Sequence, residues 1–316
     1  MMDGEPQGAA PGPSSRWAHA RGSVALDRPR VMAIVNVTPD SFFDGGRLHD
    51  GEATRVQAGV EHARRCVAHG ADLLDIGGES TRPGAEPVPP TEEARRVVPV
   101  IAAMRADAEL CDVPISIDTR RAEVAAAALE AGASIVNDIS GLDDPRMIEV
   151  VARATAGLVI GHLRGKPQTM QTQVHFADVV REVTDELVVC VERAVAGGIE
   201  RARILVDPGI GFGKTAQQSA ALVAASDALR RATGCAVLIG ASRKSFLGVI
   251  ADDTPAAEQR LPGSLAAAIV AVQHGASVLR VHDVRETVQA VSVARGISSA
   301  FDALHRPTAT AGEARA

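Results

Sequence analysis

Eight short apolar segments, separated by longer stretches with helical spacing, are the feature that most constrains how this chain folds. Each segment is a nearly continuous run of β-branched and leucine residues, typical of a strand that is buried on both faces. The segments are Val31–Asn36, Leu73–Ile76, Ile115–Asp118, Ile135–Asn137, Leu158–His162, Ile204–Asp207, Val237–Ile239 and Val278–Val281. Amphipathic stretches between them include Ala53–His69, Thr91–Ala106, Arg121–Ala131, Phe176–Ala196 and Ser264–His274. This alternation predicts βα units with parallel strands.

Repetition of the unit eight times predicts an α/β protein with a single (β/α)8 TIM barrel domain over residues 30–298. An open, doubly wound sheet is the alternative, but such sheets concentrate their chemistry at one switch point. Here polar residues follow strand after strand, which favours closure. Residues 1–29 are rich in Pro, Gly and Ser and lack the apolar core of a signal peptide, and residues 299–316 are similar. We expect a disordered N-terminal extension and a largely disordered C-terminal tail.

Composition excludes several classes of partner. With 46% hydrophobic and 23% charged residues and a net charge of −6, the chain has the make-up of an ordinary globular protein. Aromatic residues make up only 2%, which leaves no stacking platform for nucleic acid. No apolar run is long enough for a membrane span. The four cysteines are widely spaced and form no CxxC pair, so we expect reduced core thiols in a cytoplasmic protein.

Polar residues end the predicted strands, where burial costs free energy unless the groups are paired. Helix capping explains any one of them about as well as function does. It does not explain a whole ring, and barrel enzymes build their active sites at the C-terminal ends of the strands. The ring comprises Asn36, Asp75, Asp118, Asn137, His162, Asp207, Lys244 and Arg280.

The residue types in this ring indicate a ligand with two different halves. Asp118, Asn137 and Asp207 offer acceptors and a donor to a flat, donor-rich heterocycle. Cationic groups at other strand ends suit a phosphate or a departing anion. They are Arg82, Lys244, Arg280 and His282. The ring therefore predicts a nitrogen heterocycle that carries a phosphate ester.

Three loops carry further signals. Residues 37–46 and 77–85 follow strands, are rich in Gly and Pro, and are long enough to act as lids. The pair Phe42 and Phe43 in the first loop either contributes to the lid or anchors it on the barrel rim. Residues 208–215 resemble a phosphate-binding loop, but Pro208 replaces the first required glycine and offers no N–H. We expect this glycine-rich loop to pass close to a flat ligand beside Asp207 instead.

Seven motifs, in this order, resemble those of the dihydropteroate synthase family. They are Asn36–Phe42, Asp75–Gly84, Asp118–Thr119, Asn137–Ile139, Asp207–Lys214, Ser242–Ser245 and Arg280–Asp283. The resemblance extends from Arg30 to about Gly296. It implies a pterin-binding TIM barrel and a transferase of folate biosynthesis. This enzyme joins p-aminobenzoate to 6-hydroxymethyl-7,8-dihydropterin diphosphate, giving 7,8-dihydropteroate and pyrophosphate.

The same resemblance implies roles for individual residues. Asp118, Lys244 and Arg280 would be catalytic, and the pterin would contact Asp118, Asn137, Asp207, Lys244 and Arg280. The diphosphate would contact Asn36, Thr81, Arg82 and His282, with Asn36 also binding Mg²⁺. The p-aminobenzoate site would include Phe42, Pro83 and Ser245, the last at a helix N-terminus that suits a carboxylate. Phe212 is also implied as a substrate contact, and the family resemblance favours a homodimer.

The implied reaction agrees with the absence of a Ser/His/Asp or Cys/His arrangement in the sequence. Diphosphate can leave a benzylic-like carbon before attack, and an arylamine is a competent nucleophile without a strong base. Two alternatives stay open. One is a pterin-binding methyltransferase acting on methyltetrahydrofolate, and the other is a catalytically silent relative that only binds a pterin.

Overall fold

The computed structural model describes residues 15–37, 52–79, 86–165, 169–170, 174–253 and 255–305, with side chains of the first helix from Arg55 onward. Within these residues, eight parallel strands close into a barrel in the order β10-β3-β4-β5-β6-β7-β8-β9. The strands are β3 (Arg30–Asn36), β4 (Leu73–Gly77), β5 (Ile115–Asp118), β6 (Ile135–Asp138), β7 (Gly157–Gly161), β8 (Ile204–Asp207), β9 (Ala236–Ile239) and β10 (Val278–Val281). The predicted (β/α)8 TIM barrel is confirmed, with each strand within one residue of its expected bounds.

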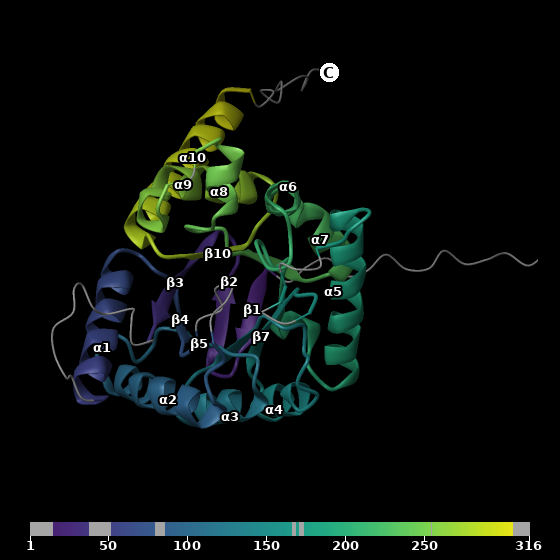
Figure 1. Cartoon of the computed structure of the whole chain (residues 1–316). Helices are drawn as coiled ribbons and strands as arrows, with labels where there is room; N and C mark the ends of the chain where they lie inside the picture. Colours follow the sequence, from purple (N-terminus) through teal and green to yellow (C-terminus); the bar gives the residue numbers. More distant parts are fainter. Residues whose placement is uncertain are drawn as a thin grey trace, which may run out of the picture.

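Helices surround the strands as a ring (Figure 1). They are α1 (Glu52–Ala68), α2 (Pro90–Ala106), α3 (Ala122–Glu130), α4 (Met147–Arg153), α5 (Val179–Ala196), α6 (Ala216–Val223), α7 (Ser226–Thr233), α8 (Phe246–Ile250), α9 (Leu261–Gln273) and α10 (Val284–His305), with short 3-10 turns η1 (Arg201–Arg203) and η2 (Ala257–Gln259). Helix α5 begins later than its apolar pattern suggested because Asp178 caps it, accepting a hydrogen bond from the Arg181 N–H.

A short antiparallel hairpin closes the N-terminal end of the barrel. It consists of β1 (Arg16–His19) and β2 (Gly22–Ala25). Trp17 is 1% exposed and packs in a cluster with inward-facing strand residues such as Met32 and Leu205. Its indole N–H donates to the carbonyl oxygen of Arg203 at 2.8 Å, so both the apolar and the polar part of the ring are satisfied.

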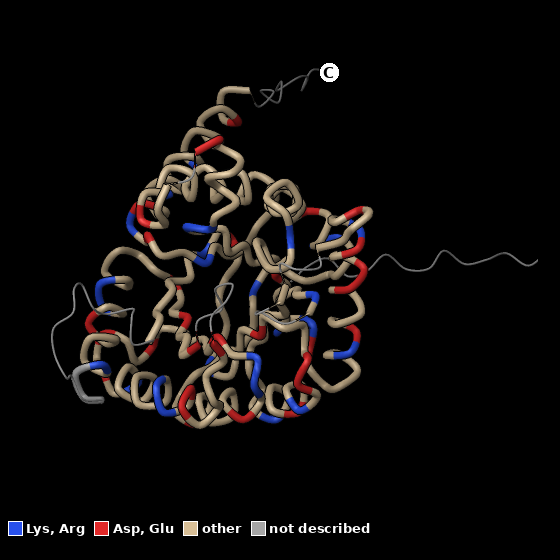
Figure 2. Tube along the Cα trace, in the orientation of Figure 1, with Lys and Arg blue, Asp and Glu red and all other residues tan. Residues whose placement is uncertain are grey.

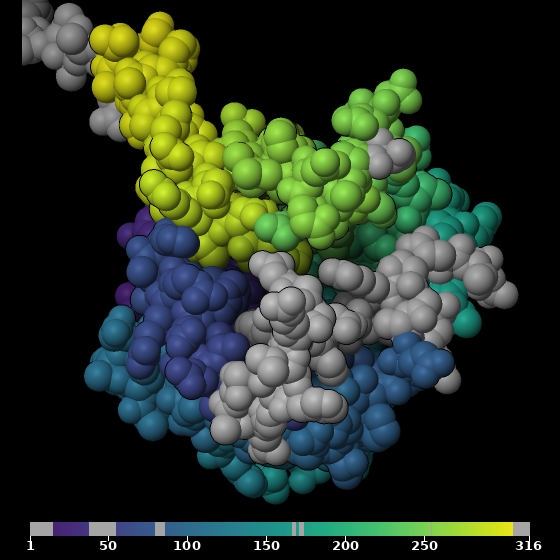
Figure 3. Space-filling model, turned by 60° about the vertical axis from the view of Figure 1, so that its left-hand side comes forward, coloured from purple at the N-terminus to yellow at the C-terminus, as the bar shows by residue number. Residues whose placement is uncertain are grey.

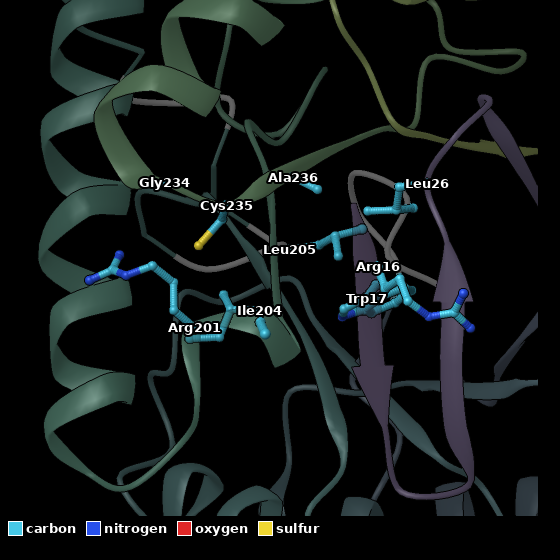
Figure 4. Close-up of a pocket in the computed structure, with 10 residues that line it drawn as sticks. Arg16, Trp17, Leu26, Arg201, Ile204, Leu205, Gly234, Cys235 and Ala236 are labelled. Carbon is cyan, nitrogen blue, oxygen red and sulfur yellow. The ribbon is translucent and has the colours of Figure 1, made fainter. Parts of the chain in front are cut away.

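The expectation of a disordered extension through residue 29 is therefore wrong for Arg16–Ala25. A parallel barrel leaves an apolar opening at the bottom of its core, and covering it stabilises even a two-stranded segment. Figure 4 shows Trp17 and Leu26 on one side of a narrow pocket that remains there, with Leu205 and Ala236 opposite. The hairpin thus belongs to the folded protein.

The C-terminal boundary also differs from expectation. Helix α10 continues through residues 299–305, which the sequence assigned to a disordered tail. Figure 3 shows the end of α10, in yellow, projecting away from the rest of the molecule. Phe301 and Leu304 in this last part are 61% and 82% exposed, so packing on the barrel does not account for the extension.

The four cysteines differ in how deeply they are buried. All four cysteines are free; Cys66 and Cys235 are buried, whereas Cys111 and Cys190 are half-buried. Burial raises the pKa of both Cys66 and Cys235 to about 11, which keeps these thiols protonated and unreactive. Among the helices whose placement is described, none has the length and hydropathy to cross a membrane.

Candidate active site

Strand register brings the predicted polar residues to one level at the C-terminal mouth. Asn36 pairs with Gly77, Gly77 pairs with Asp118, and Asp118 pairs with Asn137 across four neighbouring strands. On the other side of the barrel, Asp207 is in register with Gly161. Acidic and basic residues accordingly lie near the centre of the ring as well as on the outer helices (Figure 2).

The centre of the site is an ion-paired cluster around Arg280. Its Nε lies 2.6 Å from Oδ2 of Asp75, and its terminal NH2 lies 2.5 Å from Oδ2 of Asp118. Asn137 completes the cluster because its side-chain N–H2 donates to the same Asp75 oxygen at 3.0 Å. Asp75 is fully buried, so its charge is compensated by these two donors rather than by water.

Two buried oxygens of this cluster are left without partners. Asn137 Oδ1 and Asp75 Oδ1 have no hydrogen bond within the described parts of the chain. The amide of Asn137 is oriented by its bond to Asp75, which leaves the carbonyl oxygen as a fixed acceptor. Buried polar atoms are normally hydrogen-bonded, and unpaired ones in a mouth are the positions where a ligand donates.

A second cluster lies around Asp207, which accepts a hydrogen bond from the Gly209 N–H at 2.7 Å. Nζ of Lys244 donates to the Ile210 carbonyl oxygen and lies 4.4 Å from the centre of the Phe212 ring. A cation at this distance from an aromatic face is attracted by the ring. Phe212 and Lys244 therefore form one wall of the mouth.

The sequence predicted that the acceptors for the heterocycle and the cations for the phosphate lie in separate halves of the ring, and the structure does not separate them in this way. Arg280 is paired with the carboxylates Asp75 and Asp118, and Lys244 lies with Asp207 and Phe212. Neither cation forms a separate anion-binding region, because a buried cation is stable only next to acceptors. Both lie where the resemblance expected contacts with the heterocycle.

Burial shifts the ionisation of the central groups. It raises the pKa of Asp118 to about 7, although Arg280 opposes the shift. Burial also raises the pKa of Asp207, against the effect of Lys244. The pKa of Lys244 falls to about 8 because of burial, which Asp207 partly offsets. Shifts of this kind are typical of functional sites.

His282 and Ser245 occupy the rim. Nδ1 of His282 lies 3.1 Å from the hydroxyl of Ser242, which also accepts a hydrogen bond from the His282 backbone N–H. This Ser–His pair was not expected from the sequence. The neighbouring Asp283 accepts a hydrogen bond from Nε of Arg243 at 2.9 Å. Ser245 is exposed at the N-terminal end of α8, where the sequence placed it.

Four predicted site residues lie outside the described residues. They are Phe42, Thr81, Arg82 and Pro83, and most of the two loops expected to act as lids lies there as well. The described residues that flank the second loop are held by ion pairs. Glu79 accepts a hydrogen bond from Arg121 at 2.9 Å and another from the Val88 N–H at 3.0 Å.

Asn36 was predicted to bind Mg²⁺, and its surroundings fit that role. A Cβ atom on Gly77 would lie 3.3 Å from Oδ1 of Asn36, so the glycine keeps space next to this oxygen. Mg²⁺ in enzymes is often held by one or two protein oxygens together with substrate phosphates. The described residues contain no cluster of three or more His, Cys, Asp or Glu side chains that could hold a metal on its own.

Sequence reasoning assigned no role to three residues that the structure brings into or beside the site. Asp75 was recognised at a strand end but is also the main partner of Arg280. His162 and Lys214 are both 4% exposed and hydrogen-bonded to each other at 3.0 Å. By contrast, Asp138 accepts hydrogen bonds from the N–H and hydroxyl of Ser140, a turn-forming role.

The first glycine of the loop after β8 lies against the protein itself. Gly209 has a φ of +68°, and a Cβ there would lie 1.9 Å from the His162 carbonyl oxygen. The close neighbour of this glycine is thus protein backbone rather than a ligand. The positive φ and the lack of a side chain let the loop fold against the end of β7.

The fold and site together define a barrel enzyme that binds a flat, donor-rich heterocycle at the C-terminal mouth. The model of a family described as "Pterin binding enzyme" matches residues 32–282. The chain belongs to the dihydropteroate synthase family, and it is a transferase.

Individual relatives support this assignment over nearly the whole length of the chain. The dihydropteroate synthase of Neisseria meningitidis serogroup B is 43% identical over 281 residues, covering 88% of this chain and 95% of the relative. The Xanthomonas albilineans dihydropteroate synthase solved with 4-aminobenzoic acid is 45% identical, with a TM-score of 0.82 and coverage of 90% of this chain and 99% of that one. The same enzyme in complex with 7,8-dihydropteroate has a TM-score of 0.78 at 42% identity, with the same coverage.

Proposed function

We propose that this chain joins p-aminobenzoate to 6-hydroxymethyl-7,8-dihydropterin diphosphate, forming 7,8-dihydropteroate and releasing pyrophosphate. The observation that carries the proposal is the buried cluster of Arg280, Asp75, Asp118 and Asn137, with its unpaired acceptor oxygens. A pterin edge is rich in N–H donors and matches this surface. The relatives named as dihydropteroate synthases support the same reaction.

The pterin is held by carboxylates on two sides of the barrel. Asp118 and the open oxygen of Asn137 accept hydrogen bonds from one part of its edge, and Asp207 accepts from another. The planar guanidinium of Arg280, fixed by Asp75 and Asp118, faces the ring. Because the carboxylates of Asp75 and Asp118 already hold the guanidinium of Arg280 in place, no side-chain entropy has to be lost at Arg280 when the pterin binds.

The reaction then proceeds by departure of the leaving group. The bond between the pterin methylene carbon and the diphosphate oxygen breaks, and its electron pair leaves with pyrophosphate. The carboxylates of Asp75, Asp118 and Asp207 stabilise the positive charge that spreads over the pterin. The lone pair of the arylamine forms the new C–N bond, and the nitrogen loses a proton.

Asn36 and His282 are the described residues assigned to the diphosphate. Thr81 and Arg82, which lie outside the described residues, are assigned to it as well. Ser242 fixes the His282 ring through Nδ1. Asn36 would hold Mg²⁺ through its amide oxygen, and the ion would supply positive charge to the departing pyrophosphate. Ser245 at the start of α8 would bind the carboxylate of p-aminobenzoate. The ring of p-aminobenzoate would lie near Phe212, Phe42 and Pro83.

Turnover with purified protein tests the proposal. We expect dihydropteroate and pyrophosphate in equal amounts when the dihydropterin diphosphate, p-aminobenzoate and Mg²⁺ are supplied together. No product from folded protein would contradict the proposal. Tight pterin binding without product would identify a silent relative, and methyl transfer from methyltetrahydrofolate would identify the other barrel class.

We also propose that the chain forms a homodimer through α10. Exposed apolar side chains form a stripe along this helix at Val293, Ile297, Phe301 and Leu304. Their spacing of three and four residues places them on one face, and exposed apolar patches of this kind mark interfaces. Light scattering should give the mass of a dimer for the full chain and of a monomer for Ile297→Glu. Ser299→Glu, on the opposite face of α10, is the control that should stay dimeric.

The remaining partners are the small-molecule substrates, with no role for nucleic acid or membranes. A cytoplasmic location is part of the same proposal and is supported by the four unpaired thiols. Cell fractionation with an antibody against the chain measures it directly, and recovery in the membrane fraction would contradict it.

A further inference from the structure

Lys214 is a buried lysine that the reaction itself does not use. Its Nζ lies close to the loop formed by residues 208–213, since a Cβ atom added to Gly209 would be 3.2 Å from it. Nζ lies 3.0 Å from Nδ1 of His162, 2.9 Å from the Phe212 carbonyl oxygen and 3.4 Å from the His162 carbonyl oxygen. Burial lowers the pKa of Lys214 to about 7, against the effect of Asp207. In its ammonium form the group has three protons, and these three acceptors match them.

The contact with Lys214 fixes the tautomer of His162. Because Nδ1 accepts from the lysine, the ring is neutral and its proton is on Nε2. This Nε2–H donates to Oε2 of Glu186 at 2.9 Å, and Glu186 in turn accepts from Nε of Arg164 at 3.0 Å. Burial, and after it the charge of Lys214, lowers the pKa of His162 to about 4, in agreement with a neutral ring. Lys214, His162 and Glu186 form a continuous chain, called here the lysine–histidine–glutamate chain.

This chain joins the end of β7 to the loop that lines the substrate site. The loop follows Asp207 directly, and the His162 backbone N–H donates to the Asp207 carbonyl oxygen at 2.9 Å. The loop also contains Phe212, whose ring lies against Lys244. Lys214 holds Phe212 by its carbonyl oxygen, so one buried ammonium fixes the base of the loop that carries an aromatic wall of the site.

We propose that Lys214 is a positioning residue for the substrate site, acting through His162 and Glu186 to hold residues 208–213 so that Asp207 and Phe212 face the substrates. The inference rests on the proposed function, because the substrates it concerns are the pterin and p-aminobenzoate. Its charge also acts on Asp207. Lys214 is one of the cations that oppose the raised pKa of this carboxyl, after Lys244 and Arg280.

A purely structural lysine would lower stability without changing the affinity of the protein that remains folded. Two variants separate the possibilities. Lys214→Met removes the ammonium and keeps the apolar stem. Thr215→Ala is the matched control, since Thr215 caps α6 by accepting from the Gln218 N–H at 3.2 Å and contributes nothing to the lysine–histidine–glutamate chain.

For each variant, calorimetry measures the thermal midpoint and the dissociation constant for the pterin diphosphate, and steady-state kinetics gives kcat and the KM for p-aminobenzoate. We expect Lys214→Met to weaken pterin binding by about tenfold or more and to raise that KM, because hydrogen bonds to a buried charge are lost. Thr215→Ala should lower the thermal midpoint and leave both constants within about twofold of the parent. Parental constants in folded Lys214→Met would overturn the proposal.

The histidine provides an independent test should Lys214→Met fail to fold. His162→Asn keeps an acceptor near the position of Nδ1, whereas His162→Leu removes it. Glu186→Gln, at a side chain that is 44% exposed, removes only the charge at the far end. We expect affinity to decrease in the order parent, Glu186→Gln, His162→Asn, His162→Leu. Equal pterin affinity across this series would overturn the inference, whereas a parent protein that neither binds pterin nor turns over would overturn the proposed function itself.

Discussion

Arg280 and Asp75 are separated by 205 positions in the chain, yet Nε of the first lies 2.6 Å from Oδ2 of the second. Arg280 is on β10 and Asp75 on β4, and β3 lies between these strands in the closed barrel. The guanidinium spans β3 from the inside and reaches Asp118 on β5 as well. The pair therefore exists only because the sheet closes, and it fixes the centre of the mouth.

Replacing this arginine should affect stability and binding together. Arg280→Ala leaves the buried Asp75 without its cationic partner, and breaking a buried pair in this way costs about 3–5 kcal/mol. The pterin also loses its planar contact, so its dissociation constant should rise. Titration calorimetry of the folded fraction measures the affinity, and denaturant unfolding measures the stability. Parental pterin affinity would show that Arg280 does not contact the ring.

The affinity for the pterin should depend on pH through Asp118. Protonation turns one of the acceptor oxygens of this carboxyl into a donor and removes its negative charge, and burial raises its pKa to about 7. We expect affinity to be constant above this pH and to fall below it, by up to about tenfold per pH unit. The effect on stability has the opposite sense: the group takes up a proton on folding, so its contribution falls as pH rises from about 4 to about 7.

Asp118→Asn is the variant that tests the assignment of this pH dependence. Without the carboxyl, pterin affinity should be low, and it should no longer fall as the pH decreases below about 7. Calorimetry between pH 5.5 and pH 8.5, in steps of about half a unit, measures this dependence. If the pterin affinity of Asp118→Asn still falls at low pH as it does in the parent, the titrating group is another one. Asp207 is a candidate, because burial raises its pKa as well.

Gly209→Ala should disrupt the loop after β8. The new Cβ would lie 1.9 Å from the His162 carbonyl oxygen, and the φ of +68° is unfavourable for alanine. We expect a loss of several kcal/mol of stability and a weaker pterin site, because the backbone must move. Gly198→Ala is the control: its φ is +96°, but no atom lies within 4 Å of the added Cβ. Equal effects of the two substitutions would show that backbone strain, not the contact with His162, decides the outcome.

The N-terminal hairpin should contribute to stability without taking part in catalysis. Trp17→Ala removes a fully buried ring at the opposite end of the barrel, which we expect to cost about 3–5 kcal/mol. The KM values of the folded variant should stay at the parental level. Thermal unfolding and steady-state kinetics measure the two effects. A parental melting temperature would show that the hairpin does not close the barrel in solution.

Much of the fold could be predicted from local pattern. Strands such as β5 and β8 are apolar runs ending on an aspartate, and their register then brings the strand-end residues together without further information. The hairpin could not be predicted in the same way. Trp17 and Val24 belong to a segment with few large apolar residues, and only the open bottom of the barrel gives them a core to enter.

The site was predictable as a set of positions, but not as a set of contacts. Sequence placed Asp118, Asn137 and Arg280 at strand ends, whereas the pairing of Arg280 with Asp75 depends on which strands become neighbours on closure. Lys214 shows the same limit. Its sequence context resembles a phosphate-binding loop, an interpretation that Pro208 argued against, and only the path of the chain after β8 shows that the lysine points to His162.

The most direct test of the central claim is a crystal structure of this chain with 6-hydroxymethyl-7,8-dihydropterin diphosphate bound. The account predicts the pterin edge on Asp118, Asn137 and Asp207, with the Arg280 guanidinium against the ring and the diphosphate toward Asn36 and His282. A pterin bound away from Asp118 and Asn137, with Oδ1 of Asn137 still unpaired, would contradict it.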